Sequence, residues 1–165
     1  MPELRGEKVV LRDVRPEDGP ALRAMHAAPE VAAWWGLPKD DFLETDDDAD
    51  TLLAMEADGQ LVGYLQFYEE RDADCKHATI DLFLDPGHHR RGLGSDALRT
   101  VIGHLVDDRG HHRITIDPAV DNAPAIACYR GVGFRDVGVM RAYWRDLDGR
   151  WRDTLFMELV VLEDG

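Results

Sequence analysis

The sequence has little cysteine, no long apolar run and no excess of positive charge. Its 165 residues include only Cys75 and Cys128 as thiols, too few for a disulfide framework and without metal-ligand spacing, so we expect free thiols and no bound metal. No stretch approaches the roughly 20 apolar residues of a membrane span, and the N-terminus lacks an apolar signal region. These absences predict a cytoplasmic protein without a membrane segment.

The chain is acidic, and most of its negative charge lies in one segment. The formal net charge is −14, and residues 37–85 hold 15 acidic against three basic side chains, or −12. A field of this size repels nucleic acid and anionic lipid and attracts cations. We therefore expect no nucleic-acid or membrane partner and a cationic small molecule as partner, with a merely well-solvated surface as the alternative.

The hydrophobic pattern alternates between strands and helices along a single domain, residues 1–165. Apolar residues make up 44% of the chain, enough for a sizeable core, and no repeat or linker divides it. Strands are predicted over residues 8–14, 51–56, 61–68, 78–84, 112–116, 134–144 and 152–161. Helices are predicted to begin at Pro16, near Leu93 and at Ala123. The acidic residues 38–50 are expected to form a solvated loop or a fraying helix. This order predicts an α/β or α+β domain with a central sheet.

A glycine-rich turn joins the predicted strand 78–84 to the helix that follows. It reads Arg90-Arg91-Gly92-Leu93-Gly94-Ser95. Glycines let backbone amides approach an anion, and the first helical turn and two arginines add positive charge. The turn lacks the patterns of a dinucleotide fingerprint and of a P-loop. It predicts a phosphate site, with a tight structural turn as the alternative.

Two motifs resemble those of the GNAT-type acyl-CoA-dependent N-acetyltransferase superfamily. Residues 89–94 resemble its [RQ]-x-x-G-x-[GA] pyrophosphate segment, with His89 in the first position, and residues 122–134 resemble its N-x-x-A-x-x-x-Y-x-x-x-G-F element at every fixed position. The resemblance implies a GNAT-like fold. That fold has a mixed, mostly antiparallel sheet of about six or seven strands, flanked by about four helices and splayed at the acetyl-CoA site.

The resemblance also implies how acetyl-CoA, the co-substrate, is held. The backbone of Leu82, Phe83 and Leu84 would pair with the pantetheine arm, and Asn122 would fix that region. The pyrophosphate would lie against the glycine turn and the residue before it, that is His89, Arg90, Arg91, Gly92, Leu93, Gly94 and Ser95.

Asp81 and Tyr129 are the candidate catalytic residues. A phenol is protonated at neutral pH, so Tyr129 could donate a proton to the leaving thiolate. Asp81, on the strand beside the thioester, could accept the proton of the attacking amine or orient that amine. The alternatives are a tyrosine packed under the Gly-Phe turn and a solvent-facing aspartate.

Three segments look like the corresponding elements of aminoglycoside 6′-N-acetyltransferases: residues 33–36, 60–68 and 115–122. A polycationic acceptor needs carboxylates beside an aromatic face. The predicted acceptor-binding residues are Trp34, Trp35, Asp40, Tyr68, Glu69, Asp81, Asp117 and Asp136. One tryptophan of the pair is expected to pack in the core and the other, Trp35, to be exposed to the acceptor.

This reading predicts acetyl transfer to a primary amine of a polycationic molecule, the 6′-amine of aminoglycoside antibiotics. The alternatives are a siderophore-biosynthesis acetyltransferase acting on a hydroxylysine-type amine, a protein or peptide N-acetyltransferase, and a non-enzymatic acyl-CoA sensor. A homodimer through the two closing strands, using Tyr143 and Trp144, is a further expectation.

Overall fold

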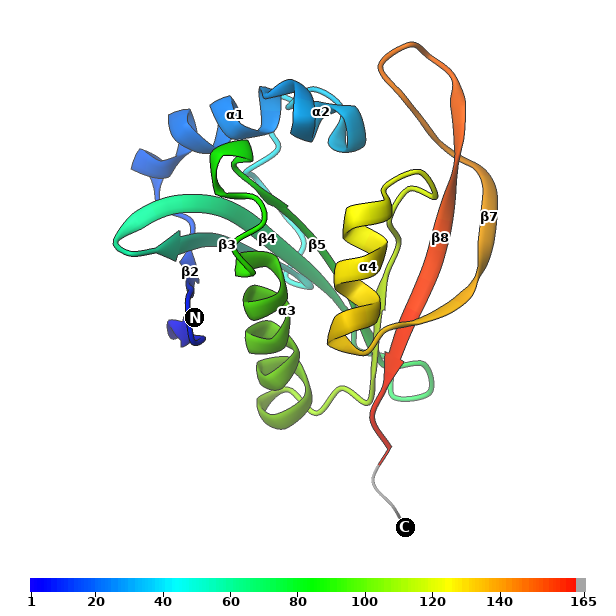
Figure 1. Ribbon diagram of the computed structural model, residues 1–165. Coiled ribbons are helices and arrows are strands. Elements are labelled where there is room, and N and C mark those ends of the chain that lie inside the picture. The colour runs from blue at the N-terminus through cyan, green and yellow to red at the C-terminus, as the bar shows by residue number, and fades with distance from the viewer. Residues whose placement is uncertain (163–165) are drawn as a thin grey trace.

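The computed structural model describes residues 1–162, which form one eight-stranded sheet with helices on both faces (Figure 1). The spatial order is β1-β2-β3-β4-β5-β6-β8-β7, and every neighbouring pair is antiparallel except the parallel pair β5 and β6. The strands are β1 (Leu4–Arg5), β2 (Val10–Asp13), β3 (Asp50–Ala57), β4 (Gln60–Glu70), β5 (His77–Leu84), β6 (Arg113–Ile116), β7 (Arg135–Arg145) and β8 (Trp151–Val160). The predicted mixed, mostly antiparallel sheet is confirmed. The eighth strand is β1, whose two residues are too short to show an alternating pattern.

Four α-helices accompany the sheet in the described residues 1–162. They are α1 (Gly19–Ala27), α2 (Pro29–Trp35), α3 (Leu93–Gly103) and α4 (Ala123–Val132). A short π-helical turn, His104–Asp108, continues α3, and the acidic segment between α2 and β3 is a loop, as predicted.

Strand alternation divides the core into two layers. Leu65, Phe67 and Ile80 are fully buried with α3 and α4. The alternate residues Tyr64 and Phe83 are buried with α1 and α2 on the opposite face. Because successive strand side chains point to opposite faces, odd and even positions of β4 and β5 have different surroundings.

The sheet opens between β5 and β6. These strands pair only at Ala78 with Ile114 and Thr79 with Thr115, whereas β5 continues to Leu84. The rest of that β5 edge is not paired with β6, and its Leu84 carbonyl lies 3.1 Å from His89 Nε2. This opening is the splay that the motifs predicted.

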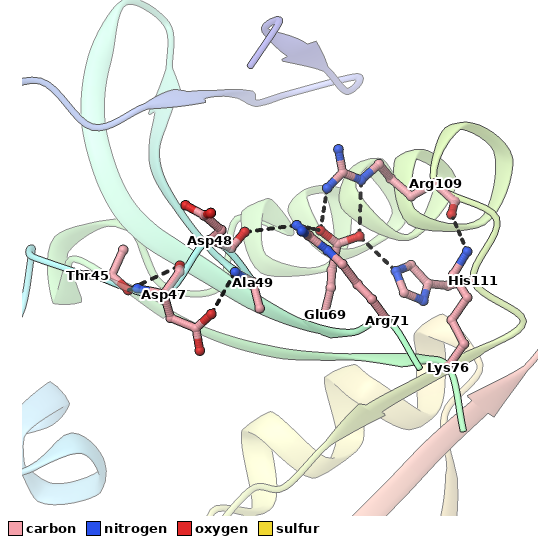
Figure 2. Close-up of polar contacts among 9 residues, drawn as sticks. All are labelled: Thr45, Asp47, Asp48, Ala49, Glu69, Arg71, Lys76, Arg109 and His111. Atoms are coloured by element: carbon pink, nitrogen blue, oxygen red, sulfur yellow. Dashed lines mark hydrogen bonds and ion pairs between the residues drawn. The ribbon is translucent and has the colours of Figure 1, made fainter. Parts of the chain in front are cut away.

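A buried ion cluster lies at the turn end of the β4–β5 hairpin, around Glu69 near the end of β4 (Figure 2). Glu69 is 3% exposed and accepts hydrogen bonds from both Arg109, with Nε at 3.1 Å, and His111, with Nε2 at 2.8 Å. Arg71 binds the Asp48 carbonyl at 2.8 Å and thereby joins the acidic loop to the cluster. Burial alone raises the pKa of Glu69, but the bonds from Arg109 and His111 outweigh it and lower the pKa to about 2.

Glu69→Gln is expected to lower the melting temperature by roughly 5–15 °C, because it removes one member of a buried ion cluster and leaves Arg109 and His111 unpaired. A carboxylate with a lowered pKa stabilises the fold above its unfolded pKa and loses this effect as pH falls through its folded pKa. The difference between the wild type and the variant should therefore shrink between about pH 4.5 and pH 2. Thermal melts across pH measure it, with the exposed Glu44→Gln as matched control. Equal melting temperatures for all three proteins at pH 7 would contradict this role.

Candidate active site

Asp81 lies on β5 on the face that α1 and α2 cover. It pairs in register with Gln66 of β4 and shares its face with Tyr64 and Phe83. The Tyr64 hydroxyl donates to Gln66 Oε1 at 2.9 Å. Burial raises the pKa of Asp81, and a hydrogen bond from Gln66 opposes this shift. A carboxylate with a raised pKa is a stronger base than a solvated one.

Asp117 follows β6 and faces Asp81 across the opening in the sheet. Burial and the negative charge of Asp81 raise the pKa of Asp117 to about 6, while the Tyr143 hydroxyl opposes the rise. Two carboxylates that repel each other in a partly buried site favour a cation between them. The arrangement therefore suits an ammonium group.

Tyr129 of α4 lies close to both carboxylates. Burial, then the neighbouring Cys128, Asp81 and Asp117, raise the pKa of its phenol above the ordinary value, so it keeps its proton at neutral pH. Its ring packs edge-on against Phe134, with centroids 6.2 Å apart. The structure thus brings together the two predicted catalytic residues and Asp117.

A cavity of about 280 Å³ lies between α2 and the ends of β6, β7 and β8. Its lining consists of Trp34, Trp35, Gly36, Asp117, Ala119, Tyr143, Trp144, Arg145 and Thr154, and we call it the acceptor cavity. Of the two adjacent tryptophans, Trp34 is exposed, at 38%, and Trp35 is half-buried. Trp35 packs edge-on against Phe83, with centroids at 5.1 Å, and against Tyr64 at 6.2 Å. The prediction that Trp35 is the exposed tryptophan was therefore wrong, because its indole completes the aromatic core under α2.

The β7 residues of the acceptor cavity were missed as site residues. The β7–β8 register shifts between Met140 and Trp144, and Ala142 has a left-handed backbone with φ of 51°. Asp153 holds this bulge by accepting the Ala142 N–H at 2.9 Å. Bulges re-aim side chains beside functional sites. Here the bulged segment brings Tyr143 and Trp144, expected at a dimer interface, to the cavity wall.

Several predicted acceptor residues lie elsewhere. Glu69 points to the opposite face of the sheet from Asp81 and is engaged in the ion cluster. Asp136 is exposed near the start of β7, and its carboxylate binds Arg130 Nη2 at 2.6 Å. Asp40 is exposed in the acidic loop outside the cavity lining. Tyr68 is 38% exposed on the Asp81 face of β4.

The free edge of β5 offers alternate residues to the opening. The Asp85 N–H donates to the Val62 carbonyl of β4 at 2.8 Å. Because strand backbone groups alternate between edges, Phe83 also pairs toward β4, while Leu82 and Leu84 present their N–H and C=O groups to the opening. Of the three residues expected to pair with the pantetheine arm, Leu82 and Leu84 thus direct backbone groups toward the opening, and Phe83 does not.

Helix α4 borders the same opening. Asn122 is its N-cap, and its Oδ1 accepts the Ala125 N–H at 3.3 Å. Cys128 Sγ lies 3.2 Å from Ser95 Oγ in the first turn of α3, so the two helices meet at this point. Both cysteines, Cys75 and Cys128, are free thiols.

The glycine loop, residues 89–95, presents backbone donors at the start of α3. Gly92 caps the helix with φ of 75°, and the first intrahelical bond runs from the Asp96 N–H to the Gly92 carbonyl at 3.1 Å. The amides of residues 93–95 therefore have no intrahelical acceptor, and they sit at the positive end of the helix dipole. This geometry fits a bound phosphate.

The basic residues of the glycine loop differ in their engagement. Arg91 Nη1 lies 2.8 Å from His88 Nδ1, and Nη2 lies 3.3 Å from the Asp58 carboxylate. Arg90 has a left-handed backbone, with φ of 63°. His89 Nε2 lies 3.1 Å from the Leu84 carbonyl. The Arg91 guanidinium is thus engaged with neighbouring side chains, and His89 contacts β5.

No helix in residues 1–162 is long and apolar enough to cross a membrane. No three or more His, Cys, Asp or Glu side chains in the same residues gather where they could hold a metal ion.

Residues 11–134 match the acetyltransferase (GNAT) family. The mycothiol acetyltransferase of Clavibacter sepedonicus is 37% identical over 99 residues, 60% of this chain and 31% of that protein. The ribosomal protein bS18-alanine N-acetyltransferase of Escherichia coli (strain K12) is 34% identical over 88 residues, 51% of this chain and 56% of that protein. The streptothricin acetyltransferase of Streptomyces lavendulae is 30% identical over 151 residues, 86% of this chain and 77% of that protein. The chain thus spans about a third to just over half of the first two relatives.

Two solved structures show the same fold. A spermidine N-acetyltransferase from Vibrio cholerae in complex with CoA and spermine has a TM-score of 0.81 at 19% identity, covering 93% of this chain and 95% of that chain. The aminoglycoside acetyltransferase AAC(6′)-Ib in complex with coenzyme A has a TM-score of 0.74 at 24% identity, covering 92% and 94%. An aminoglycoside acetyltransferase and a spermidine acetyltransferase therefore both share the fold of this chain.

Proposed function

Because the chain belongs to the acetyltransferase (GNAT) family, we propose that it transfers the acetyl group of acetyl-CoA to a primary amine of a polycationic small molecule in the cytoplasm. The specific acceptor that we propose is the 6′-amine of an aminoglycoside. The observation that supports this most is the Asp81–Asp117 pair, which faces the opening between β5 and β6 beside the aromatic acceptor cavity.

The residues around the opening fit acetyl-CoA. Leu82 and Leu84 would bind the pantetheine arm through their backbone groups, and the amides of residues 93–95 would hold the pyrophosphate, with Arg90 and Arg91 beside it. Bound there, acetyl-CoA would supply an activated acyl group next to Asp81 and Tyr129.

The chemistry follows from the two catalytic side chains. Asp81 accepts a proton from the acceptor's ammonium or amine, directly or through a water, and the neutral nitrogen attacks the thioester carbonyl carbon. As the new C–N bond forms, the C–S bond breaks, and Tyr129 donates its phenolic proton to the departing sulfur. The nitrogen gives up its second proton through solvent, which reprotonates Tyr129, and Asp81 returns its proton to bulk solvent, so an ammonium acceptor releases one proton overall. No covalent enzyme intermediate is needed.

The acceptor cavity suits a cationic ring compound. Asp117 would bind an ammonium, while the exposed face of Trp34 would cover the apolar C–H surface of a sugar ring. The acidic loop, with Asp40, would add long-range attraction for further ammonium groups. The similarity to a streptothricin acetyltransferase and the fold shared with a spermidine acetyltransferase support this class of acceptor.

The proposed homodimer would use edge strand β7, where Val137 and Val139 are exposed.

Initial rates of thiol release from acetyl-CoA test the proposal. The panel contains kanamycin, tobramycin and gentamicin, lysine and N-hydroxylysine, and short peptides that begin with alanine. Turnover is expected with the aminoglycosides. Activity on peptides alone would favour a protein N-acetyltransferase, which the ribosomal-protein relative suggests, and activity on the lysine-type amines alone would favour siderophore synthesis. CoA binding without any turnover would favour a sensor.

The protonation of Asp117 predicts a pH dependence. Its pKa of about 6 means that the carboxylate is present above this pH and lost below it, so kcat/KM for the acceptor should fall as pH drops through 6. Tyr143→Phe removes a donor that stabilises the carboxylate, so the acid limb should move to higher pH by up to about one unit. Initial rates at low acceptor concentration across pH measure this shift. An acid limb that stays in place in Tyr143→Phe would contradict the contact.

A further inference from the structure

Lys8 reaches the glycine loop from the other end of the chain. It lies in the turn between β1 and β2, which the Gly6 N–H closes by donating to the Val9 carbonyl at 2.9 Å. Its Nζ donates to the carbonyl of Arg91 at 3.0 Å, across 83 residues of sequence. A Cβ built on Gly92 would lie 2.9 Å from the same Nζ, so the ammonium sits directly against the start of α3.

A carboxylate of α3 fixes this turn in place. Asp96 is 7% exposed and accepts three backbone N–H groups, from Glu7 at 3.1 Å, Lys8 at 2.7 Å and Val9 at 2.9 Å. Gly6 permits the approach, because a Cβ there would collide with the Asp96 carboxylate. The turn is therefore held against the first turn of the helix that presents the phosphate-binding amides.

This arrangement changes the electrostatics of the glycine loop. A carboxylate in the first turn of α3 and a carbonyl just before Gly92 would both repel a phosphate. The three amides satisfy the Asp96 carboxylate on the side of the β1–β2 turn, and the Lys8 ammonium covers the Arg91 carbonyl. Arg91 directs its own guanidinium toward Asp58 and His88, so Lys8 supplies a positive charge that Arg91 alone does not.

We propose that Lys8 is a positioning residue for acyl-CoA: held by the Asp96 clamp, it fixes the Arg91 carbonyl and the left-handed Gly92 so that the amides of α3 face the pyrophosphate. This inference rests on the proposed function, because it concerns the same co-substrate site. The ligand chemistry is the diphosphate of CoA, and the thioester end plays no part. Lys8 therefore affects the binding of acyl donors that carry the phosphates and not the binding of truncated acyl donors that lack them.

Three variants test the inference: Lys8→Met removes the charge and keeps the length, Lys8→Arg restores a donor, and Arg5→Met removes an exposed cation of the same N-terminal segment as the matched control. Calorimetry measures CoA binding, and steady-state rates give kcat and KM for acetyl-CoA and for S-acetyl-pantetheine, which lacks the phosphates. Lys8→Met is expected to weaken CoA binding and raise KM for acetyl-CoA by about tenfold with kcat nearly unchanged. Lys8→Arg should recover most of the loss, and Arg5→Met should match the wild type.

The truncated donor separates positioning from general damage. Lys8→Met should leave KM for S-acetyl-pantetheine unchanged, whereas a structural defect would raise both KM values. Wild-type CoA affinity in Lys8→Met, or an equal loss with both donors, would overturn the inference and leave the proposed function standing. Failure of the wild type itself to bind CoA would instead overturn the proposed function.

Discussion

Asp81→Asn is expected to lower kcat by about 100- to 1,000-fold while the affinity for CoA stays within about twofold of the wild type. Asparagine keeps the shape of the side chain and a hydrogen-bond acceptor for Gln66, but it cannot take up the proton of an amine. The raised pKa of Asp81 makes the ionised residue a better base than a solvated carboxylate. Initial rates at saturating acetyl-CoA, together with calorimetric CoA binding, measure the effect.

The matched control is Asp136→Asn, which also removes an acidic charge but lies in a surface ion pair with Arg130. It should retain wild-type rates. If Asp81 only orients the amine, Asp81→Asn would raise KM for the acceptor with little change in kcat. Unchanged kcat in Asp81→Asn would therefore contradict its role as a base.

Tyr129→Phe is expected to lower kcat by about 10- to 100-fold, because the thiolate would leave without a positioned proton donor. The ring packing against Phe134 is kept, so the melting temperature should stay within about 2 °C of the wild type. Rates at saturating concentrations of both substrates and a thermal melt give the two readouts. A wild-type kcat in a stable variant would show that Tyr129 only packs against Phe134.

The sheet and the glycine loop could be predicted from local patterns. Residues 89–94 and 122–134 form a loop and a helix whose backbone geometry requires particular residues at fixed positions. Both motifs could therefore be recognised in the sequence before the fold was known. Asp81 and Asp117 were predicted through the family resemblance. Asp81 lies on the strand expected beside the thioester, and Asp117 lies in one of the segments that look like those of aminoglycoside acetyltransferases.

The wall of the acceptor cavity could not be predicted in the same way. Tyr143 faces Asp117 because a bulge at Ala142 re-aims the strand, and an alanine in a left-handed conformation leaves no turn signal in the sequence. Glu69 looked like an acceptor residue, but Arg109 and His111, about 40 residues later, engage it on the other face. Lys8 was equally hidden, since only the folded chain brings it to residue 91.

A matched pair of acceptors tests most directly whether the protein acetylates one amine of a polycationic ring compound. Neomycin and paromomycin differ in bearing an amine or a hydroxyl at the 6′ position. Tandem mass spectrometry of the products from acetyl-CoA should show a single acetyl group on the 6′ ring of neomycin and none on that ring of paromomycin. Equal acetylation of both would contradict the 6′ assignment, and no acetylation of either would contradict an aminoglycoside acceptor.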